Sequence, residues 1–113
     1  MSGSLGNDNL NKATAGGWLT VDGTADEVTL PVGTQAVYLS CTEDCWVLIG
    51  DPGESPTAVK PSGEKIFGRS HKLLADVQDL FYISSNEDAS LVQISAIQDS
   101  APGVLTVTCY QEV

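Results

Sequence analysis

Hydrophobic and polar residues alternate with a period of two along most of the chain from Trp18 onward. In "TQAVYLSC", for example, Val37, Leu39 and Cys41 fall on one face of an extended segment, and the residues between them fall on the other. Such alternation is typical of strands that place one face against a hydrophobic core. The pattern therefore predicts an all-β domain over residues 18–113.

Segments rich in β-branched and aromatic residues are separated by turns rich in Gly, Pro, Asn and Asp. The segments that we expect to be strands are "WLTV", "EVTLPV", "TQAVYLSC", "CWVLIG", "KIFG", "LFYISS", "SLVQISAI" and "GVLTVTCY". About eight short antiparallel strands with turns at regular intervals favour a small β-sandwich or a jelly-roll-like barrel.

One strand and three connecting regions carry further expectations. Residues 45–49 are apolar on both faces, which predicts an interior strand covered on both sides. Thr42, Glu43 and Asp44 join it to the preceding strand, and a three-residue connection predicts a β-hairpin. The proline- and glycine-rich stretch "GDPGESPTAVKPSGE" predicts a long surface loop. Apolar residues in 70–80 fit both a helix and a strand, and because the surroundings are β we expect strand or irregular chain.

The first residues of the chain differ in character from the rest. Residues 1–17 are rich in Gly, Asn, Ser and Ala, with Leu5 and Leu10 as the side chains that they could bury. We interpret them as an extended N-terminal arm without a fold of its own, either a free terminus or a strap ordered on a neighbouring molecule. Trp18 lies where arm and domain meet, so it is a candidate contact with that neighbour.

The chain is strongly acidic. Fifteen Asp and Glu residues stand against five Lys and Arg residues, for a formal net charge of −10. Such a surface repels phosphate backbones and anionic lipids, so we expect neither nucleic acid nor membrane as a partner. No apolar run approaches the ~20 residues that a membrane-spanning helix needs.

The few basic residues are clustered. Lys60, Lys65, Arg69 and Lys72 fall within thirteen residues, with His71 beside them. One interpretation is a solvated face of a soluble protein. The other is a docking patch for an acidic protein neighbour, which could be another copy of the same chain.

Three interpretations exist for the cysteines. With His71, the residues Cys41, Cys45 and Cys109 match a Cys3His zinc set in number, but structural zinc sites usually use paired C-x2–4-C knuckles. A disulfide between Cys41 and Cys45 would close a very short loop and stabilise little, and the N-terminus lacks the basic start and apolar run of a secretory signal. The leading interpretation is that the cysteines act as small buried hydrophobic residues.

No motif of catalytic quality is present. No G-x-S-x-G motif is present to supply a nucleophile for His71, and the paired acidic residues lie in predicted turns, whereas functional carboxylates need burial or a close charged partner. We therefore predict no enzymatic activity, no cofactor and no metal. Trp46 is expected in the core, whereas exposure of Trp18 or Trp46 would provide a platform for stacking sugars.

The segments "VTLPVGTQAVYLSC", "CWVLIGDPGESPTA", "LFYISS" and "SLVQISAI", preceded by the Gly- and Asn-rich arm, resemble the small decoration or cement proteins of tailed bacteriophage capsids. The resemblance covers roughly residues 18–98. It implies a non-enzymatic virion protein, made in the host cytoplasm, that binds the major capsid protein on the outside of the head as a homodimer or homotrimer. Two alternatives remain open: a carbohydrate-binding or host-recognition module of a fibre or tail, and a head-completion or tail protein.

Overall fold

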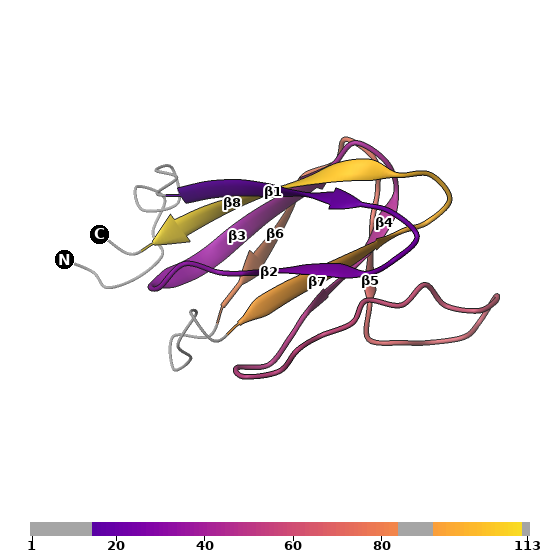
Figure 1. The fold of residues 1–113 in the computed structure, drawn as a ribbon, viewed down its shortest axis with the longest axis horizontal. Helices are drawn as coiled ribbons and strands as arrows, with labels where there is room; N and C mark the ends of the chain where they lie inside the picture. Colours follow the sequence, from indigo (N-terminus) through magenta and orange to yellow (C-terminus); the bar gives the residue numbers. More distant parts are fainter. Residues whose placement is uncertain (1–14, 84–91, 112–113) are drawn as a thin grey trace.

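The computed structural model describes residues 15–83 and 92–111, and these residues form an all-β structure (Figure 1). The strands are β1 (Ala15–Val21), β2 (Asp26–Thr29), β3 (Thr34–Cys41), β4 (Cys45–Ile49), β5 (His71–Leu73), β6 (Asp79–Tyr82), β7 (Gln93–Gln98) and β8 (Gly103–Gln111). No helix capable of crossing a membrane occurs within these ranges. Leu5 and Leu10, predicted as partner contacts, lie outside the described residues.

The strands form two four-stranded antiparallel sheets, with orders β1-β8-β3-β6 and β2-β7-β4-β5. The pairs are nested, because β1 pairs with β8, β2 with β7, β3 with β6 and β4 with β5. The chain is thus one long hairpin wrapped into two layers, which is the jelly-roll arrangement. The predicted fold class is confirmed.

The core lies between the two sheets and follows the alternation seen in the sequence. Val37, Leu39 and Cys41 of β3 point inward, as do Cys45 and Val47 of β4. Each fully buried aliphatic side chain stabilises the fold by about 1.5–3 kcal/mol relative to leaving it exposed. Burial of the thiols confirms the interpretation of cysteine as a core residue, and the three cysteines form no disulfide.

The connection between β3 and β4 corrects the predicted hairpin. The two strands lie in different sheets, so the three residues between them form an arch that crosses from one layer to the other. The Asp44 carboxylate accepts a hydrogen bond from the Ala75 backbone N–H at 2.7 Å, and the Thr42 hydroxyl accepts one from the Val104 N–H at 3.0 Å. These bonds to other segments take the place of hairpin pairing.

The segment between β4 and β5, residues 50–70, extends beyond the sandwich at the lower right of Figure 1. Its first part covers the outer face of the β2-β7-β4-β5 sheet. The backbone N–H of Ala58 donates to the hydroxyl of Ser95, whose side chain points outward from β7 and is nevertheless fully buried. Gly50 lets Pro56 approach closely, since a Cβ at Gly50 would lie 3.0 Å from the proline ring. The predicted surface loop is therefore packed on the sheet along part of its length.

Other predictions are corrected or refined by the strand bounds. "KIFG" is not a strand, because Lys65 has a positive φ of 63° that breaks an extended run. Residues 70–80 hold β5 and the start of β6 with irregular chain between, as expected. β1 begins at Ala15, so three residues that we assigned to the arm belong to the sheet.

The position of β4 is as predicted, and that of Trp46 is not. β4 is an interior strand with β7 and β5 on either side. Trp46, however, points to the outer face and is only partly buried, because its position alternates with those of Cys45 and Val47. The segment 50–70 covers Leu48 but leaves part of the Trp46 ring exposed.

Candidate functional site

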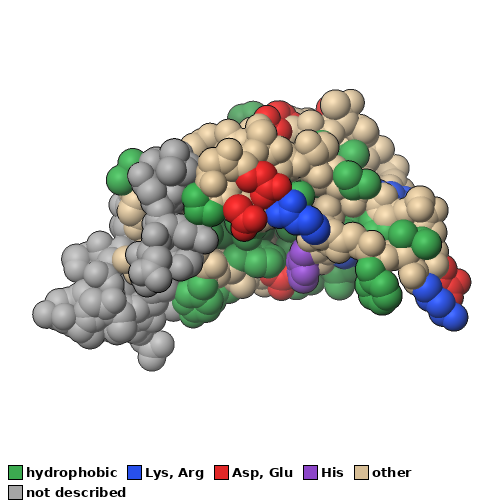
Figure 2. Space-filling view, turned by 90° about the horizontal axis from the view of Figure 1, so that it is seen from below, with side chains coloured by type: hydrophobic (Ala, Val, Ile, Leu, Met, Phe, Trp, Pro, Cys, Tyr) green, Lys and Arg blue, Asp and Glu red, His purple; other side chains and the backbone are tan. Residues whose placement is uncertain are grey.

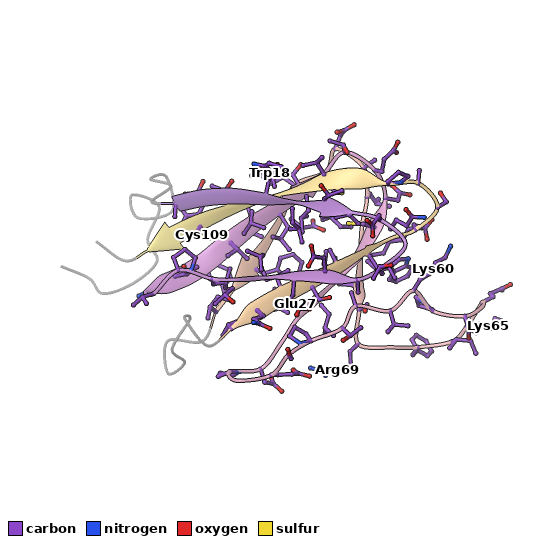
Figure 3. The ribbon with its side chains drawn as sticks, in the orientation of Figure 1. Trp18, Glu27, Lys60, Lys65, Arg69 and Cys109 are labelled. Carbon is purple, nitrogen blue, oxygen red and sulfur yellow. The ribbon has the colours of Figure 1, made fainter. Side chains whose placement is uncertain are left out.

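The clustered basic residues do not form a single patch. Figure 3 shows Lys60, Lys65 and Arg69 spaced apart along the segment after β4. Arg69 makes a two-pronged contact with the Glu54 carboxylate, at 2.7 and 3.0 Å. This contact, first through its hydrogen bonds, lowers the pKa of Glu54 to about 2 and raises the pKa of Arg69. The pair joins the two ends of the segment across its base.

Lys60 and Lys72 belong to a network around the Trp46 ring. The Trp46 indole N–H donates to the Asp99 carboxylate at 3.0 Å, and Lys60 Nζ lies 3.4 Å from the same carboxylate. Lys72 Nζ lies 5.8 Å from the centre of the indole ring and 3.9 Å from Asp44 Oδ2. Each of these two cations therefore has an acidic neighbour.

His71 also has an acidic partner. Its Nε2 lies 3.3 Å from Asp79 Oδ2, and its ring meets Phe81 edge-on with 5.3 Å between ring centres. Among the basic residues of 60–72, only Lys65 has no ion-pair partner in the described parts of the chain. The cluster is therefore largely neutralised, and Lys65 is its one cation outside an ion pair in the described residues.

The far part of the segment 50–70 is apolar as well as exposed. We define the loop tip as Val59, Lys65, Ile66 and Phe67. Phe67 is 97% exposed, with Val59 at 61% and Ile66 at 54%. A cavity of about 420 Å³ is lined by Val59, Ile66 and Phe67 of this tip and by Leu48 of β4. Seen from below (Figure 2), hydrophobic side chains lie on both sides of the histidine and continue toward this loop on the right.

A second exposed surface covers the outer side of the β1-β8-β3-β6 sheet. We define this surface, the open face, as the outward-pointing residues of these four strands. Its large side chains are Trp18, Tyr38, Leu80, Tyr82, Val104 and Tyr110. Its hydroxyl groups come from Thr20, Ser40, Thr106 and Thr108. None of the outward positions on the four strands carries a charge.

Trp18 is the most prominent side chain of the open face. It is 69% exposed, and in Figure 3 it lies above β1, away from the second sheet. An open depression of about 590 Å³ beside it is lined by Gly16, Val104 and Thr106 among others. At the other end of the face Tyr38 and Tyr110 pack edge-to-face, with ring centres 5.3 Å apart.

The described residues offer little to nucleophilic or metal chemistry. Burial, followed by the neighbouring Cys41, raises the pKa of the Cys45 thiol to about 12, and burial raises the pKa of Cys109. A thiol with so high a pKa is not a nucleophile at neutral pH. Within 15–83 and 92–111, no three His, Cys, Asp or Glu side chains are grouped as a metal site requires.

The geometry thus presents two exposed surfaces rich in apolar side chains, and comparison of the chain with family models, with curated proteins and with solved structures gave no match. Of the predicted partner-contact residues, Lys60, Lys65 and Arg69 lie on the segment 50–70, Lys72 lies next to it on β5, and Trp18 lies on the open face. The structure does not bring these two groups together.

Sequence reasoning found Lys65 but missed the apolar residues of the loop tip and most of the open face. Ile66 and Phe67 had been assigned to a strand, where one of them would have been buried. The open face could have been found, because the outward positions of "TQAVYLSC" and "GVLTVTCY" contain only Ala, Ser, Thr, Val and Tyr. In so acidic a chain, the lack of charge along two strands was the signal.

Proposed function

We propose that this chain is a non-enzymatic capsid decoration protein, which binds the outside of a tailed-phage head through its loop tip. The observation that carries the proposal is Phe67, a large aromatic side chain that is almost fully exposed at the end of a projecting segment. Aromatic residues, Phe among them, are enriched at the buried centres of protein–protein interfaces relative to the rest of the surface. The resemblance of the sequence to decoration proteins supplies the class of partner, the major capsid protein.

Contacts at its base favour the loop tip as a binding element. The Arg69–Glu54 pair joins the two ends of the segment, and the Val59 backbone N–H donates to the Ser70 hydroxyl at 3.0 Å. The Ile66 N–H donates to the Gly63 carbonyl at 3.3 Å, which closes a turn just before Phe67. A segment ordered before binding loses less conformational entropy on binding, so a small apolar anchor suffices for useful affinity.

A capsid lattice presents the same surface many times. If one protein copy binds weakly, linked copies bind far more tightly because the later contacts become intramolecular. The charge of Lys65 beside Phe67 suits an acidic rim around an apolar pocket on the shell, since opposite charges orient a docking protein. Modest contacts at each site then reinforce the head.

Binding to shells tests this proposal. Capsids purified from the virus that encodes the chain, and stripped of it, are incubated with the protein, and occupancy is measured by sedimentation. We expect Phe67→Ser to reduce affinity at least tenfold, because it removes a large apolar contact. The matched control is Leu74→Ser, which changes a 51% exposed residue outside the loop tip and should bind as the wild type does.

The charge at the loop tip gives an independent readout. Lys65→Glu should weaken shell binding and reduce its dependence on salt, whereas Lys65→Gln should have a smaller effect. Undiminished occupancy by the Phe67→Ser protein would exclude the loop tip as the shell contact. Failure of the wild-type chain to bind its own virus's shells would exclude the decoration role.

The exposure of Trp18 favours a second candidate function, a carbohydrate-binding module. An indole on a flat sheet face can stack against a sugar ring, and Thr106 provides a hydroxyl beside it. Quenching of Trp18 fluorescence by a glycan, with loss of that signal in Trp18→Ala, would support this function. Silence on a glycan array, together with normal shell binding, would reject it.

A further inference from the structure

We propose that the open face is a self-association surface, on which a second copy of the chain packs its own open face to form a face-to-face dimer. The inference is carried by the lack of charge on this face. It does not depend on the loop tip, and it extends the proposed function by separating the surface that joins copies from the surface that joins the shell.

The two sheets differ in how their outer sides are covered. Over the β2-β7-β4-β5 sheet, the segment 50–70 covers Ser95 of β7 and buries its own Pro56 and Ala58 against the sheet. No described segment lies in the same way over the β1-β8-β3-β6 sheet, where Trp18 and Tyr82 are 69% and 60% exposed. Within the described chain, the open face is therefore the sheet surface that remains for another molecule.

Electrostatics favours this face for contact between identical chains. Each copy has a net charge of −10, so two copies repel each other, and this repulsion is smallest when they meet through a surface that lacks acids. The outward positions of the four strands hold no carboxylate, and packing them together leaves no unpaired buried charge. In a two-fold dimer each patch packs against an identical patch, so it must be complementary to itself. An uncharged patch meets this requirement because it brings no like charges together.

The composition of the open face matches the centre of a protein interface. Trp and Tyr are enriched there and charged residues are depleted, which is the pattern seen at the buried centres of interfaces. The hydroxyl groups of Thr106, Thr108 and Ser40 lie between the aromatic groups at its two ends. Each hydroxyl can donate a hydrogen bond to, and accept one from, the hydroxyls of a facing copy, so packing does not leave it without a partner.

The size of the face sets the expected strength of the dimer. Four strands about 4.8 Å apart, each about seven residues long at 3.3 Å per residue, cover on the order of 450 Å². A standard interface buries about 800 Å² on each partner. The open face alone is roughly half of that, so we expect a reversible dimer whose population depends on concentration.

A second copy fits the face better than a sugar does. Sugar hydroxyls are usually held by a few precisely placed amide, carboxylate or guanidinium groups beside the stacking ring. None of the outward positions on the four strands is Asn, Gln, Asp, Glu, Arg or Lys. A flat surface of aromatic rings and single hydroxyls suits another surface like itself.

Sedimentation equilibrium of the full chain over a wide range of concentrations tests the inference. We expect the wild type to pass from monomer to dimer. Thr106→Glu places a carboxylate on the interior strand β8, and it should raise the dimer dissociation constant at least tenfold because the two-fold pair would bury both new charges. The matched control, Thr24→Glu, adds the same charge in the exposed turn after β1 and should dimerise as the wild type does.

Trp18 reports on the same event from within the face. Its emission should shift to shorter wavelength as the concentration rises, and the shift should be absent in Thr106→Glu. A melting temperature of Thr106→Glu near that of the wild type verifies that the variant is folded. In case it is not, Trp18→Ala, which removes a 69% exposed side chain, provides the second test of dimer loss.

Two outcomes would overturn the inference. One is a wild-type chain that stays monomeric at the highest concentration; the other is Thr106→Glu dimerising as tightly as the wild type. Glycan binding by a monomeric wild type, abolished in Trp18→Ala, would assign the face to a sugar instead. Shell binding that is lost in Phe67→Ser but retained in Thr106→Glu monomers would separate this result from the fate of the proposed function.

Discussion

Asp99 is the residue that ties together one end of the second sheet. Its carboxylate accepts from the Trp46 indole and faces Lys60, while its backbone N–H donates to the Asp44 carbonyl. The hydrogen bond from Trp46, with the nearby lysines, lowers the pKa of Asp99. The partly exposed Trp46 is therefore held by its polar atom, and this contact explains how a tryptophan outside the core stays ordered.

At the same scale, Glu54 makes the loop tip sensitive to acid. Its pKa is lowered from 4.5 to about 2, chiefly by the hydrogen bonds from Arg69. Because the pKa of the folded state lies below that of the unfolded chain, the contribution of the pair is fully present above pH 4.5 and is lost as the pH falls toward 2. The pair is exposed, so its effect on global stability is small.

We predict that Glu54→Gln loosens the segment 50–70 at neutral pH with little change in the melting temperature. Hydrogen exchange of the amides of Val59 and Ile66 should be faster in the variant than in the wild type at pH 6. Because exchange is intrinsically slower in acid, the two proteins are compared at each pH, and their difference should vanish near pH 2. A difference independent of pH would show that the carboxylate charge is not what holds the segment.

At the scale of elements, the arch between β3 and β4 depends on close packing against the start of β8. A Cβ at Gly103 would lie 2.8 Å from Thr42 Oγ1 and 3.1 Å from Glu43 Cβ. The same hydroxyl accepts the Val104 N–H, so it cannot move away without losing a hydrogen bond. Glycine is needed here for space, because the side chains of Thr42 and Glu43 pack directly against the backbone at Gly103.

We predict that Gly103→Ala destabilises the fold by about 1–3 kcal/mol, the usual cost of inserting a methyl group into a packed region. Urea unfolding followed by fluorescence measures the change. Gly17→Ala is the control, because a Cβ there meets nothing within 4 Å. Equal stability of the two variants would contradict a tightly packed arch.

Most elements were predictable from the sequence, and the exceptions have physical reasons. β3 was predicted at its observed bounds because its eight alternating residues allow only one assignment of the buried face and the outer face. The arch was not, since a three-residue connection fits a hairpin and an inter-sheet crossing equally well and only the partner strands decide. The sequence could not separate β5 from irregular chain, because its three residues include an exposed His71 and Lys72, and its pairing with β4 is a tertiary effect.

The candidate surfaces were predictable only in part. The basic residues are visible in the sequence, but their neutralisation is not, because Glu54 and Asp99 reach them from 15 and 39 positions away. Trp18 was selected for its place at the start of the domain and is indeed exposed. Phe67 could not be recognised as an exposed residue, because the segment "KIFG" fits a strand until the positive φ of Lys65 is known.

For the whole molecule, the three thiols report on the integrity of the core. Cys41, Cys45 and Cys109 come from both sheets, and each is no more than 3% exposed. A reagent therefore reaches them only when the layers separate.

We predict that the three cysteines react with a thiol reagent at the rate of global unfolding and together. Labelling followed by mass spectrometry should show unmodified and triply modified chains, with few intermediates. In urea all three should react at once. Rapid labelling of Cys109 alone in the native protein would show that the end of β8 opens independently of the rest.

The place of β8 has a consequence for how the protein is made. β8 lies between β1 and β3 in its sheet, although it follows all the other described strands in the sequence. Until β8 leaves the ribosome, β1 has no neighbouring strand to pair with, so this sheet cannot form before residues 103–111 are translated. We expect the sandwich to form only after β8 has emerged, so that a premature stop before residue 103 yields an insoluble fragment in place of a smaller domain.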